Sequence, residues 1–206
     1  MSFWKRWDLL GYLLLLISSV TFDQSTKLHA QKSLMTWYDE SELRSYRADS
    51  VLVGHLGVSP STRRDLELPE ESQNWIDFRL TYVRNPGAAW GSFGNVPQKF
   101  RLPIFYAITA VVSVALIYMF RTSKVSQRLN RTALVLVMGG ALGNFIDRVM
   151  LQYVIDWIHF HWKIGGWEYS FPVFNWADVS INVGIGLMIL DMLLVSLAEK
   201  RMAKHA

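Results

Sequence analysis

Residues Leu102 to Phe120 read LPIFYAITAVVSVALIYMF, a run without a charged side chain. A helix needs about 20 consecutive apolar residues to cross a bilayer, so this run predicts a spanning helix. The residues that follow, Arg121 to Arg131, read RTSKVSQRLNR and contain four cations and no acid. Because the cytoplasmic loops of membrane proteins collect Lys and Arg, this loop predicts both a membrane fold and its orientation.

Three further apolar runs have a similar length, at about residues 7–29, 132–149 and 178–198. The first follows Lys5 and Arg6, as the apolar part of a signal peptide does. Residues 23–27 read DQSTK, however, and offer no small-x-small cleavage site, so we expect a retained helix. Both termini are basic, so four spans place both termini in the cytoplasm and leave residues 28–101 and 150–177 outside.

The composition agrees with a membrane protein. The chain has 206 residues, which predicts one domain over 1–206, and it is 51% hydrophobic but only 18% charged, against about 25% in soluble domains. The net charge of +4 does not indicate nucleic acid, because the basic residues flank apolar runs and form no separate basic face. The absence of cysteine excludes disulfides, thiol catalysis and cysteine–zinc sites.

The predicted outer segments carry the signals of a small β-sheet. Residues Ile76–Val83 alternate between apolar and polar side chains, which predicts a strand with one apolar face. Tyr153–Trp157 and Tyr169–Phe174 predict further short strands. Within a polar excursion at 30–74, a short surface helix is expected around Trp37–Tyr46. The predicted fold class is a mainly α membrane protein with four transmembrane helices, a small extracytoplasmic β-sheet and a short surface helix.

Polar residues that are unusual for a membrane protein gather at the predicted outer face. They come from five parts of the chain and comprise Asp23, Lys27, Asn85, Asn144, Asp147, Arg148, Asp156, Asn175 and Asp178. Several have structural interpretations, such as an ion pair between Asp23 and Lys27 four residues apart, or a first-turn helix acid for Asp178. Asp156 is harder to explain in this way, because it interrupts the apolar run Val154–Ile158 beside the membrane. Their joint occurrence on one side and at one depth indicates a functional site.

The chemistry available to these residues favours a pair of carboxylates. The sequence has no nucleotide-binding loop, and a lone His159-x-His161 is weak evidence for a metal, so no cofactor or metal is expected. Ser25 and Lys27 are two residues apart on a helix and point in different directions, which argues against a serine–lysine dyad.

The best candidates for such a pair are Asp156 and Asp178. They bracket the second outer loop and have no adjacent cation in the sequence, whereas Asp23 and Asp147 each have one nearby. One carboxylate of a pair could activate water as a base while the other protonates the substrate as an acid.

Five motifs follow one another along the chain: DQSTK at 23–27, NPGAA at 85–89, GGALGNFIDR at 139–148, VIDWI at 154–158 and FNWAD at 174–178. On a four-span frame, this set resembles the bacterial lipoprotein signal peptidases (signal peptidase II). The resemblance implies an aspartyl endopeptidase of the bacterial inner membrane whose site faces the periplasm. Its substrates would be diacylglyceryl-modified prolipoproteins, cut just before the lipidated cysteine. The expected partners are this substrate and membrane lipids, with no nucleic acid; a monomer and sensitivity to globomycin are also expected.

By motif, the resemblance assigns catalysis to Asp156 and Asp178. It implies supporting or substrate-binding roles for Asp23, Lys27, Asn85, Gly87, Asn144, Asp147, Arg148 and Asn175. We expect Arg148 and Asn144 to hold the outer end of the third span. Asn85 and Asn175 would bind the substrate backbone or steady the pair.

The chain also departs from the family pattern. The segment between Lys27 and Asn85 is longer than usual, the loop between the two catalytic acids is slightly long, and Trp90 stands where Phe is more common. None of these changes touches the two acids. The sequence gives no role for residues 30–74 or for Asp191.

Two other classes of function fit parts of the sequence. A small transporter or channel would use intramembrane acids along an ion path, but it would distribute them through the bilayer, whereas only Asp191 lies away from the outer face. A non-catalytic partner protein would use the outer excursion, but it gives no reason for two cation-free acids beside the membrane.

Overall fold

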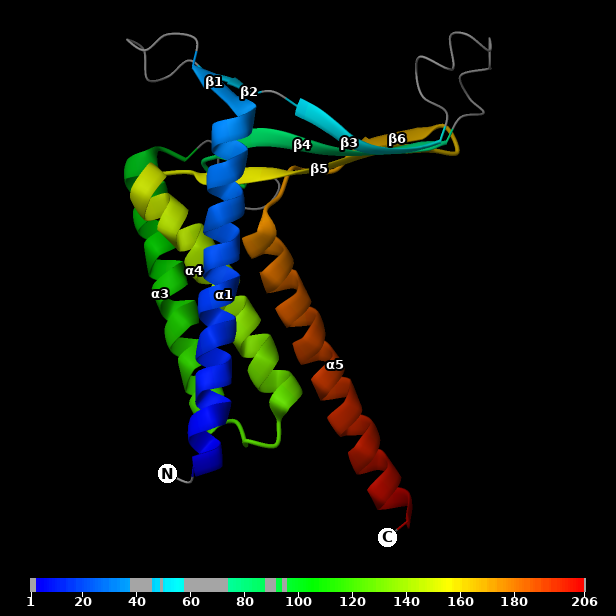
Figure 1. The fold of residues 1–206 in the computed structure, drawn as a ribbon. Coiled ribbons are helices and arrows are strands. Elements are labelled where there is room, and N and C mark those ends of the chain that lie inside the picture. Colours follow the sequence, from blue (N-terminus) through cyan, green and yellow to red (C-terminus); the bar gives the residue numbers. More distant parts are fainter. Residues whose placement is uncertain are drawn as a thin grey trace. The chain divides into compact units, whose positions relative to one another are not determined.

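The computed structural model describes residues 3–37, 46–48, 50–57, 74–87, 92–93 and 96–205. The chain divides into two compact units (Figure 1). The helical unit comprises Met1–Ser25, Asn95–Gln152 and Trp176–Ala206, and the sheet unit comprises Thr26–Gly94 and Tyr153–Asn175. The single-domain expectation for 1–206 stays a prediction.

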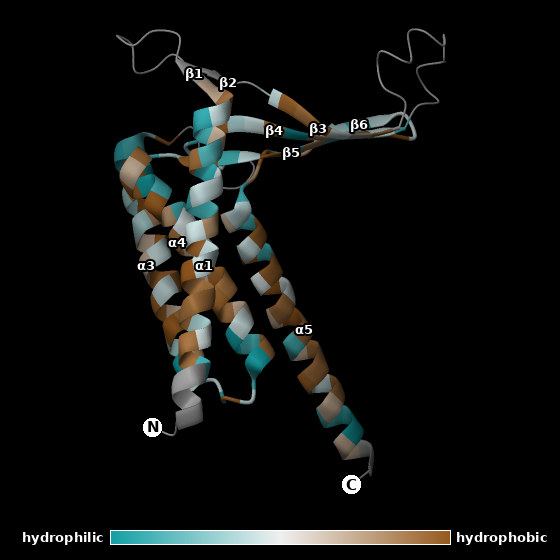
Figure 2. Cartoon of the chain, viewed as in Figure 1, coloured by the Kyte–Doolittle hydropathy of each residue, from teal (hydrophilic) through white to brown (hydrophobic). Residues whose placement is uncertain are grey.

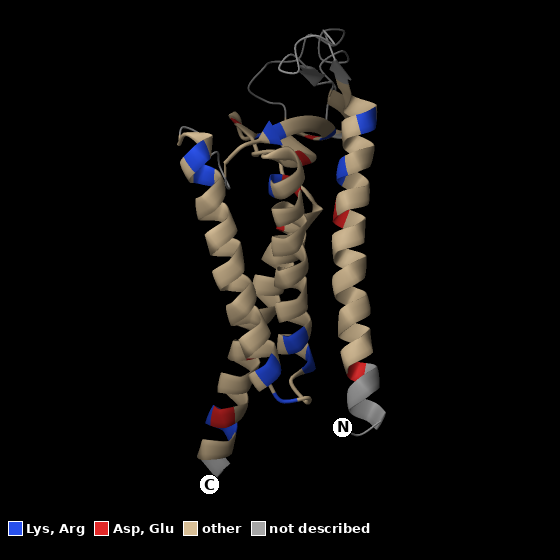
Figure 3. Ribbon diagram, turned by 90° about the vertical axis from the view of Figure 1, so that its left-hand side faces the viewer, with Lys and Arg blue, Asp and Glu red and all other residues tan. Residues whose placement is uncertain are grey.

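Four long helices dominate the described residues: α1 (Phe3–Leu34), α3 (Gln98–Thr122), α4 (Arg128–Leu151) and α5 (Trp176–His205). Each contains a stretch long and apolar enough to cross a bilayer, namely Asp8–Leu34, Gln98–Thr122, Arg128–Leu151 and Trp176–Ala203. Hydrophobic residues follow one another along these helices in Figure 2, and charged residues are sparse along them in Figure 3. The four predicted spans are therefore confirmed, and all four helices extend beyond the predicted bounds.

In the helical unit, α4 buries more of its span than any of the other three helices. Its glycines allow this close packing. A Cβ added at Gly140 would lie 2.3 Å from the backbone oxygen of Ala177 in α5, and one at Gly139 would lie 2.8 Å from Ser19 Oγ in α1. Small residues let helix backbones approach closely in membranes, where lipid supplies no hydrophobic drive for association. The apolar core beside these contacts contains Leu116, Leu134 and Val137.

A defined cap ends α4 shortly before the sheet unit begins. Gln152 adopts the left-handed conformation with φ 71°, and its backbone N–H donates to the carbonyl oxygen of Arg148. A left-handed residue after the last helical turn satisfies a terminal carbonyl and stops the helix. The chain can therefore leave α4 and enter the strand that carries Asp156 within a few residues.

The sheet unit contains a four-stranded antiparallel sheet in the order β3-β4-β5-β6 and a separate pair, β1-β2. The strands are β1 (Met35–Trp37), β2 (Tyr46–Ala48), β3 (Ser50–Gly57), β4 (Trp75–Asn85), β5 (Val154–Ile164) and β6 (Trp167–Ser170). The predicted strand at Ile76–Val83 is confirmed as part of β4. The one at Tyr153–Trp157 is confirmed as the start of the longer β5.

Side chains of β5 alternate between two faces. Phe160 stacks on Phe78 of β4 with ring centroids 5.0 Å apart. His159, on the opposite face by the two-residue period of a strand, accepts or donates a hydrogen bond with Ser170 Oγ at 2.9 Å. Asp156 shares the parity of Phe160, so the candidate acid lies on the aromatic face of this strand.

Two predictions about the outer segments, the surface helix and the strand at Tyr169–Phe174, were wrong in part. The surface helix around Trp37–Tyr46 is contradicted at both ends, since Trp37 of β1 pairs with Tyr46 of β2; residues 38–45 lie outside the described residues. The polar excursion at 30–74 begins with the last turn of α1 and contains the strand β3.

The predicted strand at Tyr169–Phe174 begins earlier and ends earlier, as β6. Gly165 and Gly166 both have positive φ, which is what a two-residue hairpin turn requires, and they pair Ile164 with Trp167. After Ser170 the regular pairing stops, because Pro172 has no N–H to donate to a strand ladder.

Candidate active site

Asp156 is buried in the sheet unit, and both of its carboxylate oxygens accept hydrogen bonds from asparagine amides. Asn85 Nδ2 donates to Asp156 Oδ2 at 2.9 Å, and Asn175 Nδ2 donates to Asp156 Oδ1 at 2.6 Å. Asp156 has a relative exposure of 3% and Asn175 of 0%. A buried carboxylate requires such donors, since it has lost its hydration. These contacts hold the carboxyl group in one orientation.

The orientation of the Asn85 amide is itself fixed. The backbone N–H of Gly87 donates to Asn85 Oδ1 at 2.9 Å, across the turn that follows β4. Because the amide oxygen is occupied by this donor, the amide nitrogen is the end that faces Asp156. This contact explains structurally why Asn85 and Gly87 occur two residues apart in the NPGAA motif.

Asp178 lies in the first turn of α5, in the helical unit. Asn144 Nδ2, from α4, donates to Asp178 Oδ1 at 2.9 Å. The Arg148 guanidinium stacks 4.3 Å from the centroid of the Phe105 ring, and its Nη1 donates to the backbone oxygen of Asn144 at 3.2 Å. Arg148 therefore braces the turn of α4 that presents Asn144, and Asn144 contacts the candidate acid.

Asp23 and Asp147 are wholly or almost wholly buried in the helical unit. Asp23 Oδ1 accepts the backbone N–H of Ala177 at 2.8 Å, at the start of α5, where an acid satisfies a terminal donor and interacts favourably with the helix dipole. Gln24 Nε2 donates to Asp147 Oδ1 at 2.9 Å and to the backbone oxygen of Gly143 at 3.1 Å. These polar contacts join α1 to α4 and α5.

Gln24 is a contact residue that the sequence analysis did not single out. It lies inside the DQSTK motif, directly after Asp23, so the motif itself contained the signal. Gln24 carries no charge that would mark it as unusual beside a membrane, yet its amide makes two contacts to α4.

The two units divide the sequence-predicted residues between them. Lys27, Asn85, Gly87, Asp156 and Asn175 belong to the sheet unit, and Lys27 is 1% exposed. Asp23, Asn144, Asp147, Arg148 and Asp178 belong to the helical unit. Within each unit, one candidate acid is brought together with at least one asparagine. The pairing of Asp156 with Asp178 stays a prediction.

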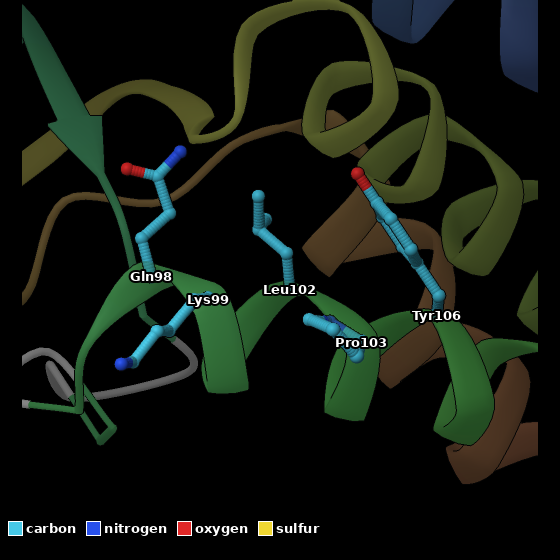
Figure 4. A pocket seen from close by; sticks show the side chains of 5 residues that line it. All are labelled: Gln98, Lys99, Leu102, Pro103 and Tyr106. Carbon is cyan, nitrogen blue, oxygen red and sulfur yellow. The ribbon is translucent and has the colours of Figure 1, made fainter.

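Other features of the described residues lie apart from these clusters. Among the described part of the chain, no group of three His, Cys, Asp or Glu side chains is placed to hold a metal ion. An open depression of about 530 Å³ is lined by Gln98, Lys99, Leu102, Pro103 and Tyr106 of α3. In Figure 4 the side chains of Gln98, Leu102 and Tyr106 turn to the same side of that helix. None of the candidate residues lines this depression.

Comparison with known proteins identifies the chain. Its fold is that of a multi-pass bacterial membrane enzyme: it resembles a solved structure described as a bacterial membrane enzyme determined by the in meso method at 1.9 Å resolution, with a TM-score of 0.59, 30% identity, and coverage of 89% of this chain and 92% of that one. The chain belongs to the signal peptidase II family, whose model, Peptidase_A8, matches residues 15–194.

Two curated relatives carry the same family description. The lipoprotein signal peptidase of Anaeromyxobacter sp. (strain Fw109-5) is 32% identical over 192 residues, covering 90% of this chain and 85% of the relative. That of Syntrophotalea carbinolica is 43% identical over 113 residues, covering 55% of this chain and 66% of the relative. The matched region thus spans just under two thirds of the second relative's length.

Proposed function

We propose that this protein is a membrane-embedded aspartyl endopeptidase that removes signal peptides from diacylglyceryl-modified prolipoproteins and cuts just before the lipidated cysteine. Membership of the signal peptidase II family supports the substrate class and the reaction type. The names of the relatives support the same substrate class and argue against the transporter or channel alternative.

Within this proposal, Asp156 and Asp178 are the catalytic pair. The observation that carries the assignment is the set of asparagine amides that hold each carboxyl group in a defined orientation. Asn85 and Asn175 donate to Asp156, and Asn144 donates to Asp178. A carboxyl group held in a fixed orientation is positioned for proton transfer to and from a bound substrate. Acids held in this way are suited to gain and lose a proton during a reaction.

The proposed reaction uses one shared proton. Two carboxyl groups in close proximity do not both ionise readily, so one is an acid and the other a base, and the pair titrates as a unit. The base removes a proton from water as the water oxygen attacks the scissile carbonyl carbon, and the acid protonates the carbonyl oxygen. The tetrahedral intermediate then breaks its C–N bond, and the leaving amine takes the proton that the base had accepted from water. One hydroxyl group of the intermediate returns its proton to the other carboxylate, which forms the product carboxyl group and restores the pair. Acid–base work of this kind supplies roughly 10²–10⁴-fold.

The proposed location is the bacterial inner membrane, with both termini in the cytoplasm and the catalytic pair toward the periplasm. Supporting this orientation, the short connection between α3 and α4 contains Lys124, is flanked by Arg121 and Arg128, and has no acid; all three cations are exposed. Besides the prolipoprotein, membrane lipids are the proposed partners, and we propose that the enzyme acts as a monomer.

The decisive experiment measures cleavage of a diacylglyceryl-modified prolipoprotein by the purified protein and by Asp156→Asn and Asp178→Asn. Both variants should lose turnover, whereas Asp191→Asn, which changes an acid elsewhere in α5, should keep it. Normal turnover by either of the first two variants would remove that residue from the mechanism. Activity should also persist with a chelator; loss with EDTA and recovery with zinc would replace the two-acid mechanism with a metal-dependent one.

A further inference from the structure

A tyrosine–arginine–tyrosine cluster lies beside the Asp156 site in the sheet unit. The Tyr82 side chain is fully buried, with 0% exposure. Its hydroxyl lies 3.4 Å from the Tyr153 hydroxyl and 3.4 Å from Arg84 Nε, which donates to it. The Arg84 guanidinium also lies over the Tyr153 ring, 5.1 Å from the centroid. Tyr82, Arg84 and Tyr153 form what we call the clamp.

The clamp has properties of a fixed structural unit. Buried phenol groups need a polar partner, and here two partners converge on one hydroxyl. Burial raises the pKa of Tyr82 above its ordinary value, so the hydroxyl stays protonated over the physiological range. Arg84 extends the contacts further, since its Nη2 lies 3.3 Å from Met35 Sδ at the start of β1. The end of β4 is thereby tied to β1 and to the residue that precedes β5.

Strand geometry places the clamp and the site on opposite faces of β4. Arg84 and Asn85 are neighbours, so their side chains point to opposite faces, and Tyr82 shares the face of Arg84. In the β4–β5 pairing, Val83 lies opposite Asp156 and Asn85 lies opposite Val154. The acid and its amide donor thus meet on one face, while the clamp holds the other.

The regular pairing of β4 with β5 does not fix the register at the end of β4, so other contacts must do so. The pairing of β4 with β5 is irregular between Leu80 and Val83, so the regular ladder does not by itself dictate how the last residues of β4 align. A shift of one residue turns every side chain of a strand to the other face. Such a shift would take the Asn85 amide away from Asp156. Tyr82 lies within the irregular stretch, and Arg84 lies immediately after it.

We propose that Tyr82, Arg84 and Tyr153 are positioning residues that lock the end of β4 in the register that keeps the Asn85 amide on Asp156. This inference rests on the proposed function for its effect on cleavage. Its structural part, the link from the clamp to Asn85 and Gly87, is tested without activity.

The kinetic test compares Arg84→Met, Asn85→Ala and the double variant in prolipoprotein cleavage. Arg84→Met should lower kcat, by up to about 100-fold if the carboxyl group shifts by about 1 Å, with a much smaller change in KM. If Arg84 acts through Asn85, the double variant should be no slower than Asn85→Ala alone. Multiplying losses would overturn the proposal. Thr81→Val is the matched control, because Thr81 lies on the same strand as Arg84 but its exposed hydroxyl contacts Ser50 of β3, so kcat should be unchanged.

The structural test measures hydrogen–deuterium exchange at the Gly87 amide, whose N–H donates to Asn85 Oδ1. Arg84→Met should speed exchange at Gly87, and so should Tyr153→Phe, which keeps the ring beneath the guanidinium and is the milder variant if Arg84→Met folds poorly. Unchanged protection of Gly87 in a folded variant would overturn the proposal. If Asp156→Asn proves active, the proposed mechanism fails, but faster exchange at Gly87 would still establish the clamp.

Discussion

The amide of Asn144 donates to Asp178 Oδ1 at 2.9 Å, joining the fifth turn of α4 to the first turn of α5. Arg148 steadies this contact from one turn further along α4, because its Nη1 donates to the backbone oxygen of Asn144 while its guanidinium plane covers Phe105. Arg148 therefore supports the turn of α4 that carries Asn144, and Asn144 contacts the acid. The orientation of the Asp178 carboxyl group depends on helix packing in the helical unit.

Asn144→Ala should therefore lower kcat for prolipoprotein cleavage, with only a small decrease in Tm. Loss of an amide donor to a carboxyl group costs about 1–3 kcal/mol, which corresponds to a fall in kcat of roughly fivefold to 150-fold. The measurement is single-turnover cleavage in detergent, with thermal unfolding recorded in parallel.

Asn182→Ala provides a matched control for this prediction. The Asn182 amide donates to the backbone oxygen of Asp178 at 2.8 Å from an exposed position, so it contacts the same residue but not its carboxyl group. Its cleavage rate should stay near that of the parent. Equal losses in the two variants would show that any disturbance near Asp178 slows the enzyme.

Gly140→Ala should destabilise the helical unit. The added Cβ would lie 2.3 Å from the Ala177 backbone oxygen and 2.7 Å from Ile181 Cγ1, and a backbone atom cannot move aside without moving the helix. Overpacking of this kind typically costs about 1–3 kcal/mol. Thermal unfolding in detergent should show a lower Tm. Gly186→Ala is the control, because a Cβ there meets no atom within 4 Å, and its Tm should be unchanged or slightly higher.

The sequence predicted the elements whose pattern matches their surroundings. Apolar runs gave the four helices, because lipid rewards uninterrupted hydrophobicity. The alternation of apolar and polar side chains predicted β4, which lies between two strands and has two distinct faces. The edge strand β3 was missed because its residues Val51, Leu52 and Val53 are all about half exposed and show no two-residue period. The pair Gly165-Gly166 is a hairpin-turn signal in the sequence, and it indicates where β6 begins.

The candidate site was predictable by residue but not by contact. Motifs pointed to Asp156, Asn85 and Asn175, yet the hydrogen bonds among them depend on strand pairing and on the turn at Gly87, which spacing does not reveal. Asp23 was expected to face Lys27 along one helix. That pairing stays a prediction, whereas the hydrogen bond from the backbone N–H of Ala177 to Asp23 had no sequence signal, because it depends on α1 packing against the start of α5 in the helical unit. The clamp gave no sequence signal, since Tyr and Arg are ordinary residues for a strand.

The proposed orientation predicts the location of reporters inserted at two turns. A reporter after Lys124, in the basic connection between α3 and α4, should be active only in the cytoplasm. A second reporter between Gly165 and Gly166 should be active only in the periplasm; this turn is suited to insertion, because nothing lies within 4 Å of a Cβ at either glycine. A cytoplasmic signal from the hairpin reporter would contradict the model in which the sheet unit is periplasmic.

The stability of the sheet unit should fall in mild acid because of His159. Burial lowers the pKa of this imidazole below its ordinary value of 6.5, and the charges of His161 and Arg79 lower it further. The unfolded chain therefore binds a proton near pH 6.5, while the folded sheet binds it only at lower pH. Stability contributed by neutral His159 is fully present above 6.5 and is lost as the pH falls through 6.5 toward the folded pKa. On the same face of the sheet, His159 forms a hydrogen bond with Ser170, and His161 Nε2 lies 3.0 Å from Glu168 Oε1.

Urea unfolding followed by tryptophan fluorescence, at several values between about pH 8 and pH 5, measures this effect. The midpoint should decrease below pH 6.5 in the parent, and His159→Gln should flatten that decrease, because glutamine keeps a polar partner for Ser170 but does not titrate. His29→Gln, at an exposed position of α1, should retain the parental pH dependence. The opposite result would be a midpoint that rises in the parent as the pH falls, with a smaller rise in His159→Gln. It would mean that the sheet stabilises the protonated imidazole, and the assignment of burial as the dominant cause would be wrong.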